Sequence, residues 1–119
     1  MDARDKAFLA AAAAEAKLAD QVMVLDLQEH TPVTDFFVIA TGSSGVQIKA
    51  ITEAVEEALQ AAGESPGRAE GRVDGSWVLL DFGDVVVHIF GQREREYYGL
   101  ERLWGDAPVL AREAPARDG

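Results

Sequence analysis

The feature that most restricts the fold of this chain is a pair of apolar six-residue runs separated by two turn residues. The runs are Trp77–Phe82 and Val85–Phe90, with Gly83 and Asp84 between them. Runs rich in β-branched and aromatic residues, joined by a two-residue turn that contains glycine, predict an antiparallel β-hairpin. An antiparallel pair at this point argues against a purely parallel, doubly wound sheet.

The two-residue turn also predicts which side chains of the hairpin share a face. Counted outward from the turn, one face is entirely apolar and is expected to contact the core. Its members are Val78, Leu80, Phe82, Val85, Val87 and Ile89. The opposite face combines aromatic, aliphatic, carboxylate and imidazole side chains, a mixture typical of the centre of a protein interface. Its members are Trp77, Leu79, Asp81, Val86, His88 and Phe90.

Two interpretations of this mixed face remain open. In one, the face docks another protein. In the other, a helix or the segment 97–104 covers it, and Trp77 and Phe90 are ordinary core residues. Asp81 and His88 are diagonal neighbours in this register, so a structural hydrogen bond that fixes the imidazole tautomer is expected between them, rather than a catalytic pair.

The remaining patterns predict helices and strands around the hairpin. Residues 4–18 are rich in alanine and other strong helix formers. Residues 21–27 and 36–41 are short runs that are apolar on both faces, as strands of a covered sheet are. A second helix is predicted after Ser44, because Ser44 and Gln47 form a capping box ahead of an amphipathic stretch.

The order of these elements predicts an α/β protein of the α+β type, with a mixed sheet of about five strands and flanking helices. Residues 68–73 are a candidate edge strand, and residues 93–104 have a short amphipathic helical pattern that Gly99 weakens. We expect one domain over residues 1–107. The last residues, 108–119, are rich in proline, alanine and charge and are predicted to be disordered.

Composition excludes several classes of protein. The chain carries 11 basic and 21 acidic side chains, a net charge of −10, which argues against direct binding of DNA and favours a basic protein as partner. It has no cysteine and two distant histidines, so neither disulfides nor a metal site is expected. No apolar run approaches the roughly 20 residues of a membrane span, and the amino terminus lacks a signal-peptide pattern. A cytoplasmic protein is expected.

A glycine–serine turn is the one candidate for catalysis. Gly42 and Ser43 lie between a predicted strand and a helix, where backbone amides can hold a phosphate. With Asp81 and Asp84 they are similar to nucleotidyltransferase sites, in which carboxylates hold magnesium. The turn lacks a Walker lysine, and the carboxylates do not alternate along one strand. We therefore predict a turn and helix cap, with no catalytic residue and no cofactor; a nucleotide-binding or nucleotidyltransferase-like enzyme is the alternative, and an acidic adaptor a third possibility.

Three segments, in this order and spacing, carry a resemblance to a known family. They are Thr34–Ser44, Trp77–Phe90 and Tyr98–Trp104. Together they resemble the ribosomal silencing factor family, also called Iojap-like, over roughly residues 5–107. The chain departs from the family at Gly99, where a polar residue is expected.

The resemblance implies a fold related to nucleotidyltransferases without their chemistry, and a homodimer in the free state. It implies binding to the fourteenth-numbered protein of the large ribosomal subunit, on the intersubunit face. A protein bound there would obstruct joining of the small subunit and lower translation when nutrients are scarce.

Carried over residue by residue, the resemblance implies eight partner-binding residues. They are Trp77, Asp81, His88, Phe90, Tyr98, Glu101, Leu103 and Trp104. Trp77 and Trp104 would be aromatic anchors. Asp81 and Glu101 would face basic side chains of the partner. The alternative for Tyr98, Leu100, Leu103 and Trp104 is that they only dock the last helix on the sheet, and for Leu100 this alternative is favoured.

Overall fold

Six strands form one mixed sheet, and the predicted hairpin supplies two of them. The computed structural model describes residues 1–71, 76–99 and 107–112. The strands are β1 (Asp20–Asp26), β2 (Phe36–Gly42), β3 (Arg68–Gly71), β4 (Trp77–Asp81), β5 (Val85–Gly91) and β6 (Val109–Arg112). The helices are α1 (Ala3–Ala16), α2 (Gly45–Ala61) and α3 (Gln92–Tyr98). The predicted α/β fold with a mixed sheet is confirmed, with six strands in place of about five.

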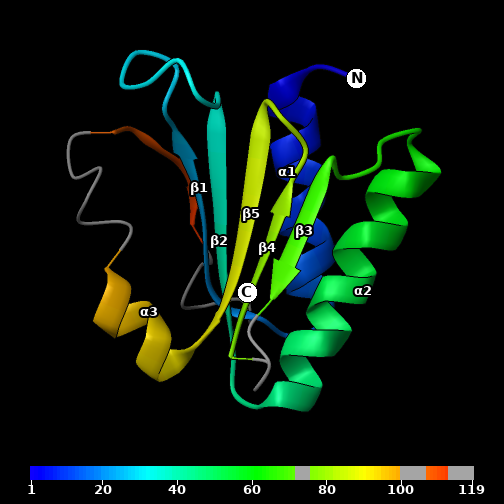
Figure 1. Ribbon diagram of the computed structural model, residues 1–119, viewed down its shortest axis with the longest axis vertical. Helices are drawn as coiled ribbons and strands as arrows, with labels where there is room; N and C mark the ends of the chain where they lie inside the picture. The colour runs from blue at the N-terminus through cyan, green and yellow to red at the C-terminus, as the bar shows by residue number, and fades with distance from the viewer. Residues whose placement is uncertain (72–75, 100–106, 113–119) are drawn as a thin grey trace, which may run out of the picture.

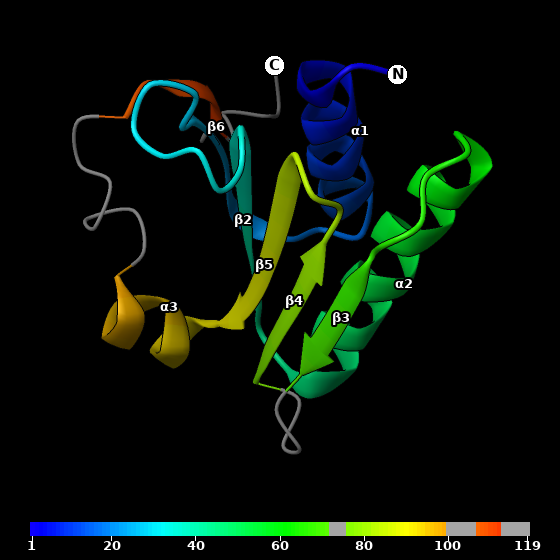
Figure 2. The same ribbon diagram turned by 45° about the horizontal axis from the view of Figure 1, so that its top comes forward.

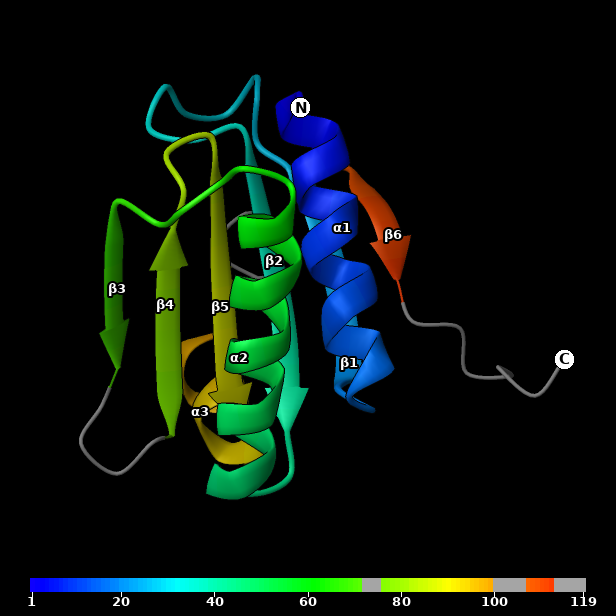
Figure 3. The ribbon, with the colours of Figure 1, turned by 90° about the vertical axis from the view of Figure 1, so that its right-hand side faces the viewer.

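The sheet separates two helical layers. Its strands follow the order β3-β4-β5-β2-β1-β6 (Figure 1), with β2 parallel to β5 and the other four neighbouring pairs antiparallel. Helices α1 and α2 lie side by side over one face of the sheet, whereas α3 lies beyond the other face (Figure 3). In the part of the chain that the structure describes, none of the helices combines the length and apolar character needed to cross a bilayer.

The main core lies between the sheet and the two long helices. The buried residues of α2 recur at three- and four-residue spacing, as predicted. They are Ile48, Ile51, Val55 and Leu59. The predicted core face of the hairpin completes this core, because each of its six residues is buried in the core or packs against it. They are Val78, Leu80, Phe82, Val85, Val87 and Ile89.

The hairpin has the predicted register. Trp77 lies opposite Phe90, and Leu79 lies opposite His88. The backbone N–H of Phe82 donates to the carbonyl of Val85 at 2.8 Å and closes the turn. Gly83 has φ of +90°, a conformation that glycine adopts readily and other residues do not. The turn residues therefore determine which side chains face the core and which face outward.

The prediction that residues 108–119 are disordered is wrong for residues 109–112. These residues form β6, which pairs antiparallel with β1 and places Met23 opposite Arg112. The N–H of Asp26 also donates to the carbonyl of Pro108 at 2.9 Å. Because β1 is apolar on both sides, pairing at its open edge stabilises a four-residue strand that its own composition does not predict. Residues 113–119 lie outside the described part of the chain.

The last predicted helix is shorter than the pattern suggested. Helix α3 covers seven residues and ends at Gly99, which has φ of +56°. A left-handed glycine immediately after the last turn is a common helix stop. The departure from the family pattern at Gly99 therefore coincides with the end of the helix. Residues 100–104, the rest of the predicted helix, lie outside the described residues.

A buried lysine joins three elements at one end of the sheet. Lys6, on α1, is 5% exposed. Its Nζ lies 2.7 Å from Asp84 Oδ1 in the hairpin turn and 3.0 Å from Glu64 Oε1 beyond α2. Burial opposes the charge, but hydrogen bonds and attraction to Asp84 and Glu64 outweigh it and raise the pKa of Lys6 above its usual value. The ammonium group therefore stays charged and cross-links α1, the hairpin turn and the segment that follows α2.

Just beyond the carboxyl end of α1, a leucine occupies a position that normally requires glycine. Leu18 has φ of +64° and is 80% exposed. Its N–H donates to the carbonyl of Glu15 at 2.9 Å, and Ala19 N–H donates to that of Ala14 at 3.2 Å. These bonds form a Schellman motif with Leu18 at the left-handed position. A side chain at such a position costs roughly 1 kcal/mol.

Replacing this leucine with glycine is expected to stabilise the protein. In Leu18→Gly the strain at φ of +64° is relieved, and the free energy of unfolding should rise by about 1 kcal/mol, measured by urea denaturation. Leu18→Ala is the matched control, because it removes the same exposed apolar surface but keeps a Cβ. A Leu18→Gly variant no more stable than Leu18→Ala would contradict the strain argument.

Candidate functional site

Four aromatic rings gather on the side of the sheet opposite α1 and α2. We call Phe37, Trp77, His88 and Phe90 the aromatic face. The ring centroids of Trp77 and Phe90 lie 5.5 Å apart at 20° between planes, and those of His88 and Phe90 lie 5.8 Å apart at 7°. Phe37 meets His88 edge-on at 4.8 Å. These rings come from three neighbouring strands, β4, β5 and β2, whose outer surface is turned to the viewer in Figure 2.

Burial on the aromatic face increases from β4 to β5. Phe90 is 1% exposed and His88 5% exposed, whereas Trp77, Leu79 and Asp81 are half-buried. Phe90 belongs to a second, smaller core around β1, β2 and β5. That core comprises Leu25, Leu27, Ile39, Phe90 and Ala107, with Met23, Phe37 and Trp77 packed against it. Each interpretation of the mixed face therefore describes part of it, because its β5 side is core and its β4 side reaches the surface.

The imidazole of His88 is held as a neutral group. Its Nδ1 accepts a long hydrogen bond, 3.4 Å, from the indole Nε1 of Trp77, so the proton of the neutral ring is on Nε2. Nε2 is buried and makes no hydrogen bond with the residues that the structure describes. Burial lowers the pKa of His88 to about 4, and the negative charge of Asp81 only partly opposes this effect.

The predicted hydrogen bond between Asp81 and His88 is replaced by two others. Asp81 Oδ1 accepts from the backbone N–H of Gly83 at 2.8 Å, a local bond within the turn. His88 takes the indole of Trp77 instead. The reason is that an aspartate next to a turn finds a backbone donor two residues away without ordering any further chain.

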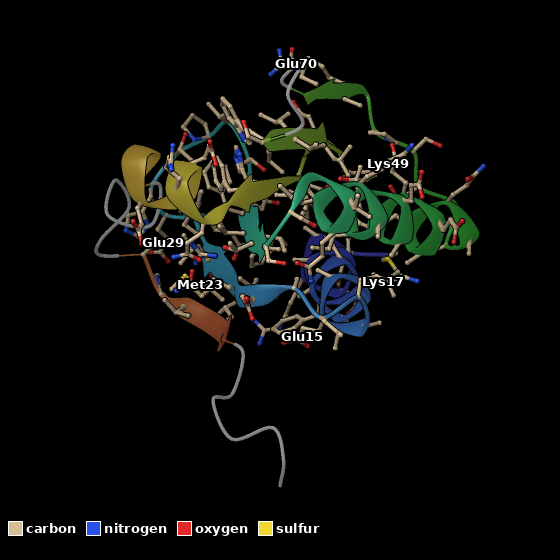
Figure 4. The ribbon with its side chains drawn as sticks, turned by 90° about the horizontal axis from the view of Figure 1, so that it is seen from below. Glu15, Lys17, Met23, Glu29, Lys49 and Glu70 are labelled. Carbon is tan, nitrogen blue, oxygen red and sulfur yellow. The ribbon has the colours of Figure 1, made fainter. Side chains whose placement is uncertain are left out.

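A shallow hollow adjoins Trp77 on its β3 side. It has a volume of about 160 Å³ and is lined by Glu70, Gly71, Trp77 and Leu79. Glu70, labelled in Figure 4, lies on exposed β3 and pairs with Arg68 at 3.3 Å. A partner side chain can therefore reach Trp77 from β3, next to a carboxylate.

The glycine–serine turn is a helix cap, as predicted. Ser44 Oγ accepts from the N–H of Gln47 at 3.1 Å, and Gln47 Oε1 accepts from the N–H of Ser43 at 2.6 Å. Two backbone donors of the turn, the N–H groups of Ser43 and Gln47, are thus satisfied within the chain. A Cβ on Gly42 would lie 2.7 Å from Cγ1 of buried Ile48, so packing alone requires glycine there.

The alternative enzyme site is not assembled. Gly42 pairs with Gly91 at one end of the parallel strands, whereas the turn with Asp81 and Asp84 lies at the other end, where Phe36 pairs with Val85. The strand length separates them by roughly 20 Å, at about 3.3 Å per residue. Among the residues that the structure describes, no cluster of three potential metal ligands occurs. The nucleotidyltransferase-like site predicted as an alternative from Gly42, Ser43, Asp81 and Asp84 is therefore wrong.

Half of the predicted partner-binding residues can be located fully. Trp77, Asp81, His88 and Phe90 share the outer face of the hairpin. The side chain of Tyr98, at the end of α3, lies outside the described part of the structure, as do Glu101, Leu103 and Trp104. Sequence reasoning missed the role of Phe37 in the aromatic face. Alternation along β2 indicates its side, but only the parallel pairing with β5 places it beside His88.

The fold and the face together define a class: a small α/β domain whose distinctive surface is an aromatic sheet face. A family model described as "Ribosomal silencing factor during starvation" matches residues 1–118. The chain therefore belongs to the ribosomal silencing factor family, and the resemblance seen in its motifs is confirmed.

Relatives in bacteria and in plants agree. The chain is 43% identical over 101 residues to the ribosomal silencing factor RsfS of Bacillus subtilis, covering 85% of this chain and 86% of that protein. It is 39% identical over 102 residues to the chloroplastic protein Iojap of Zea mays, covering 86% of this chain and 44% of that protein. Both family names implied by the motifs thus occur among its relatives.

Solved structures share the fold as well. A crystal structure of a protein from Chromobacterium violaceum superposes with a TM-score of 0.85 at 34% identity, covering 98% of this chain and 97% of that one. A crystal structure of a protein from Bacillus halodurans superposes with a TM-score of 0.75 at 40% identity, covering 87% of this chain and 94% of that one.

Proposed function

We propose that this chain binds the large ribosomal subunit through its fourteenth-numbered protein at the intersubunit face. In this position it sterically blocks joining of the small subunit and represses translation under nutrient limitation. It acts in the cytoplasm and catalyses no reaction. Support comes from family membership and from relatives named ribosomal silencing factors. In the structure, the observation that carries the proposal is the half-buried Trp77, fixed at the border between a small core and the surface.

The predicted contacts have different roles in this proposal. Trp77 and Asp81 are half-buried and can meet a partner directly. His88 and Phe90 are buried and stack against the indole, so they hold Trp77 in place before docking. An anchor that is already ordered loses less conformational entropy on binding than a mobile one. We therefore propose Trp77 as the anchor, with His88 and Phe90 as its support.

Charge favours a basic partner for the same face. The chain has a net charge of −10. On the outer surface of β3 and β4, Glu70 lies opposite Leu79, and Asp81 lies opposite Arg68, which pairs with Glu70. Complementary charge mainly accelerates encounter and suppresses wrong partners. The association rate with large subunits is therefore proposed to fall as salt is added, because exposed charges are screened.

Two further points of the proposal rest on the family resemblance. The free chain is proposed to be a homodimer, which sedimentation equilibrium tests directly. Tyr98, Glu101, Leu103 and Trp104 are proposed as additional contacts with the partner. Affinity purification of large subunits with the tagged chain, followed by cross-linking, identifies the bound protein and separates this proposal from an adaptor for another basic protein.

Removing the anchor is expected to weaken binding without unfolding the domain. In Trp77→Ala, loss of the indole should reduce the affinity for large subunits by about 2 kcal/mol, or roughly 30-fold, as measured by co-sedimentation. Leu18→Ala, an exposed apolar residue beyond the carboxyl end of α1, is the control and should bind normally. Unchanged binding by Trp77→Ala would remove this residue from the interface.

The activity itself has a direct assay. Purified chain is added to separated ribosomal subunits, and their joining is followed by light scattering. Wild type is expected to prevent the rise in scattering, and Trp77→Ala to require a higher concentration for the same effect. Unimpaired joining at saturating wild-type protein would refute steric silencing.

A further inference from the structure

A buried arginine connects the short helix α3 to two strands of the sheet. Arg95 is 5% exposed, although its neighbour Arg93 on the same helix is exposed. Its Nη1 donates to Thr41 Oγ1 on β2 at 2.9 Å and to the backbone carbonyl of Gln21 on β1. Its Nη2 lies 3.3 Å from the sulfur of Met23. One side chain thus joins segments that are 54 to 74 positions apart in the sequence.

The backbone of β1 is distorted where it meets this arginine. Asp20 pairs with Thr41, but the next pair is Met23 with Ile39, so β1 carries one extra residue. Gln21, inside this bulge, has φ of +52°, a left-handed conformation that is unfavourable for a residue with a side chain. A bulge turns one carbonyl out of the strand ladder. The carbonyl of Gln21 accepts from Arg95 instead.

Helix α3 is too short to be stable through its own turns. It has seven residues, begins immediately after β5 and has no side-chain cap at Gly91. Isolated helices shorter than about 12 residues are marginal in water, so tertiary contacts must hold one of this length. Figure 1 shows α3 standing apart from α1 and α2 at the end of β5, and Figure 4 shows Met23 on the α3 side of the sheet, away from Lys49 on α2.

We propose that Arg95 is a positioning residue for partner docking. By fixing α3 to β1 and β2 and contacting Met23, which packs against the small core that includes Phe90, it holds α3 on the side of the sheet that carries the aromatic face. A buried guanidinium and a left-handed glutamine are both unfavourable by themselves, and together they form one specific attachment. This role rests on the proposed function, because it concerns the same docking face.

The first test compares two arginines of one helix. Arg95→Met keeps the length and apolar stem of the side chain but removes its donors, and Arg93→Met is the matched control at an exposed position. Arg95→Met should accelerate hydrogen exchange of the amides of α3 and leave those of α2 protected. Its affinity for large subunits should fall at least tenfold, with Arg93→Met unchanged. Arg95→Lys should recover part of the affinity, because an ammonium group can still donate to one acceptor.

The second test removes the acceptor on the other side. Thr41→Val replaces the hydroxyl by a methyl group of similar size, and the double variant with Arg95→Met completes a double-mutant cycle. If Arg95 positions α3 through Thr41, the loss of affinity in the double variant is smaller than the sum of the single losses. Strict additivity would overturn the proposed contribution of Thr41.

The outcomes distinguish this proposal from the one on which it rests. Normal binding by Arg95→Met, or exchange in α3 like that of Arg93→Met, would overturn the positioning role. If wild type does not bind large subunits, the proposed function fails and the docking role fails with it. In that case the exchange experiment alone still decides whether Arg95 attaches α3 to the sheet.

Discussion

Acidification from pH 6.5 toward pH 4 is expected to lower the free energy of unfolding by about 3 kcal/mol through His88 alone. The folded protein keeps this imidazole neutral, since its pKa is lowered from 6.5 to about 4. The unfolded chain takes up a proton near pH 6.5, so it binds more protons than the folded chain and is favoured as the pH falls. A difference of roughly 2.5 in pKa corresponds to about 3 kcal/mol, at about 1.4 kcal/mol for each pH unit.

Urea denaturation at a series of pH values measures this effect. In His88→Phe an aromatic ring is retained beside Trp77 and Phe90, but it does not titrate. The difference in free energy of unfolding between this variant and wild type should therefore change between pH 6.5 and 4 and then level off. His30→Asn, at the exposed second histidine, controls for a general change of charge and should keep the wild-type loss. Parallel pH profiles for wild type and His88→Phe would show that the imidazole does not remain neutral. Proton NMR of the two histidines gives an independent reading.

Loss of the buried lysine is expected to destabilise the fold by about 2 kcal/mol at pH 7. Lys6→Met keeps the apolar stem but leaves Asp84 and Glu64 without their shared cation. Breaking a fully buried ion pair costs about 3–5 kcal/mol. The value expected here is smaller, because the side chains of Asp84 and Glu64 are 36% and 27% exposed and can regain water. Lys49→Met, at an exposed position of α2, is the matched control.

The pH dependence of this variant follows from the raised pKa of Lys6. The stabilisation by charged Lys6 is complete at pH values below the pKa of lysine in the unfolded chain, about 10.4. It disappears as the pH rises through the higher pKa of Lys6 in the folded protein. The difference between wild type and Lys6→Met, measured by thermal unfolding, should therefore be constant around neutral pH and decrease above about pH 10. Equal stability of Lys6→Met and wild type at pH 7 would mean that desolvation of the ammonium group cancels its two ion pairs.

Local rules explain most of what the sequence predicted correctly. The turn at Gly83 specifies the hairpin register, because pairing outward from a two-residue loop leaves no freedom. The cap at Ser44 and the apolar stripe of α2 likewise depend on residues a few positions apart. Each of these features depends on residues that are close together in the sequence, so the sequence alone is sufficient to predict it.

The features that were missed depend on contacts between distant segments. Strand β6 exists because β1 has an open edge, and nothing in Val109–Arg112 alone indicates this partner. The sequence gives no sign that Arg95 is buried, because its acceptor is the carbonyl of Gln21, which the bulge in β1 places beside it. Burial of His88 likewise depends on packing beside β2, which only the parallel pairing reveals. The hairpin pattern thus predicts which residues share the outer face. It does not predict which of them can meet a partner directly and which are buried and hold Trp77 in place.

Strand β6 also has a consequence for the order of synthesis. Every other strand of the sheet precedes it, so β1 has an unpaired and largely apolar edge while residues 27–108 are being made. Open edges of this kind recruit other chains. A nascent chain stopped before residue 109 is therefore expected to be prone to aggregation. Release of four further residues completes a sheet whose first strand was among the earliest segments to emerge.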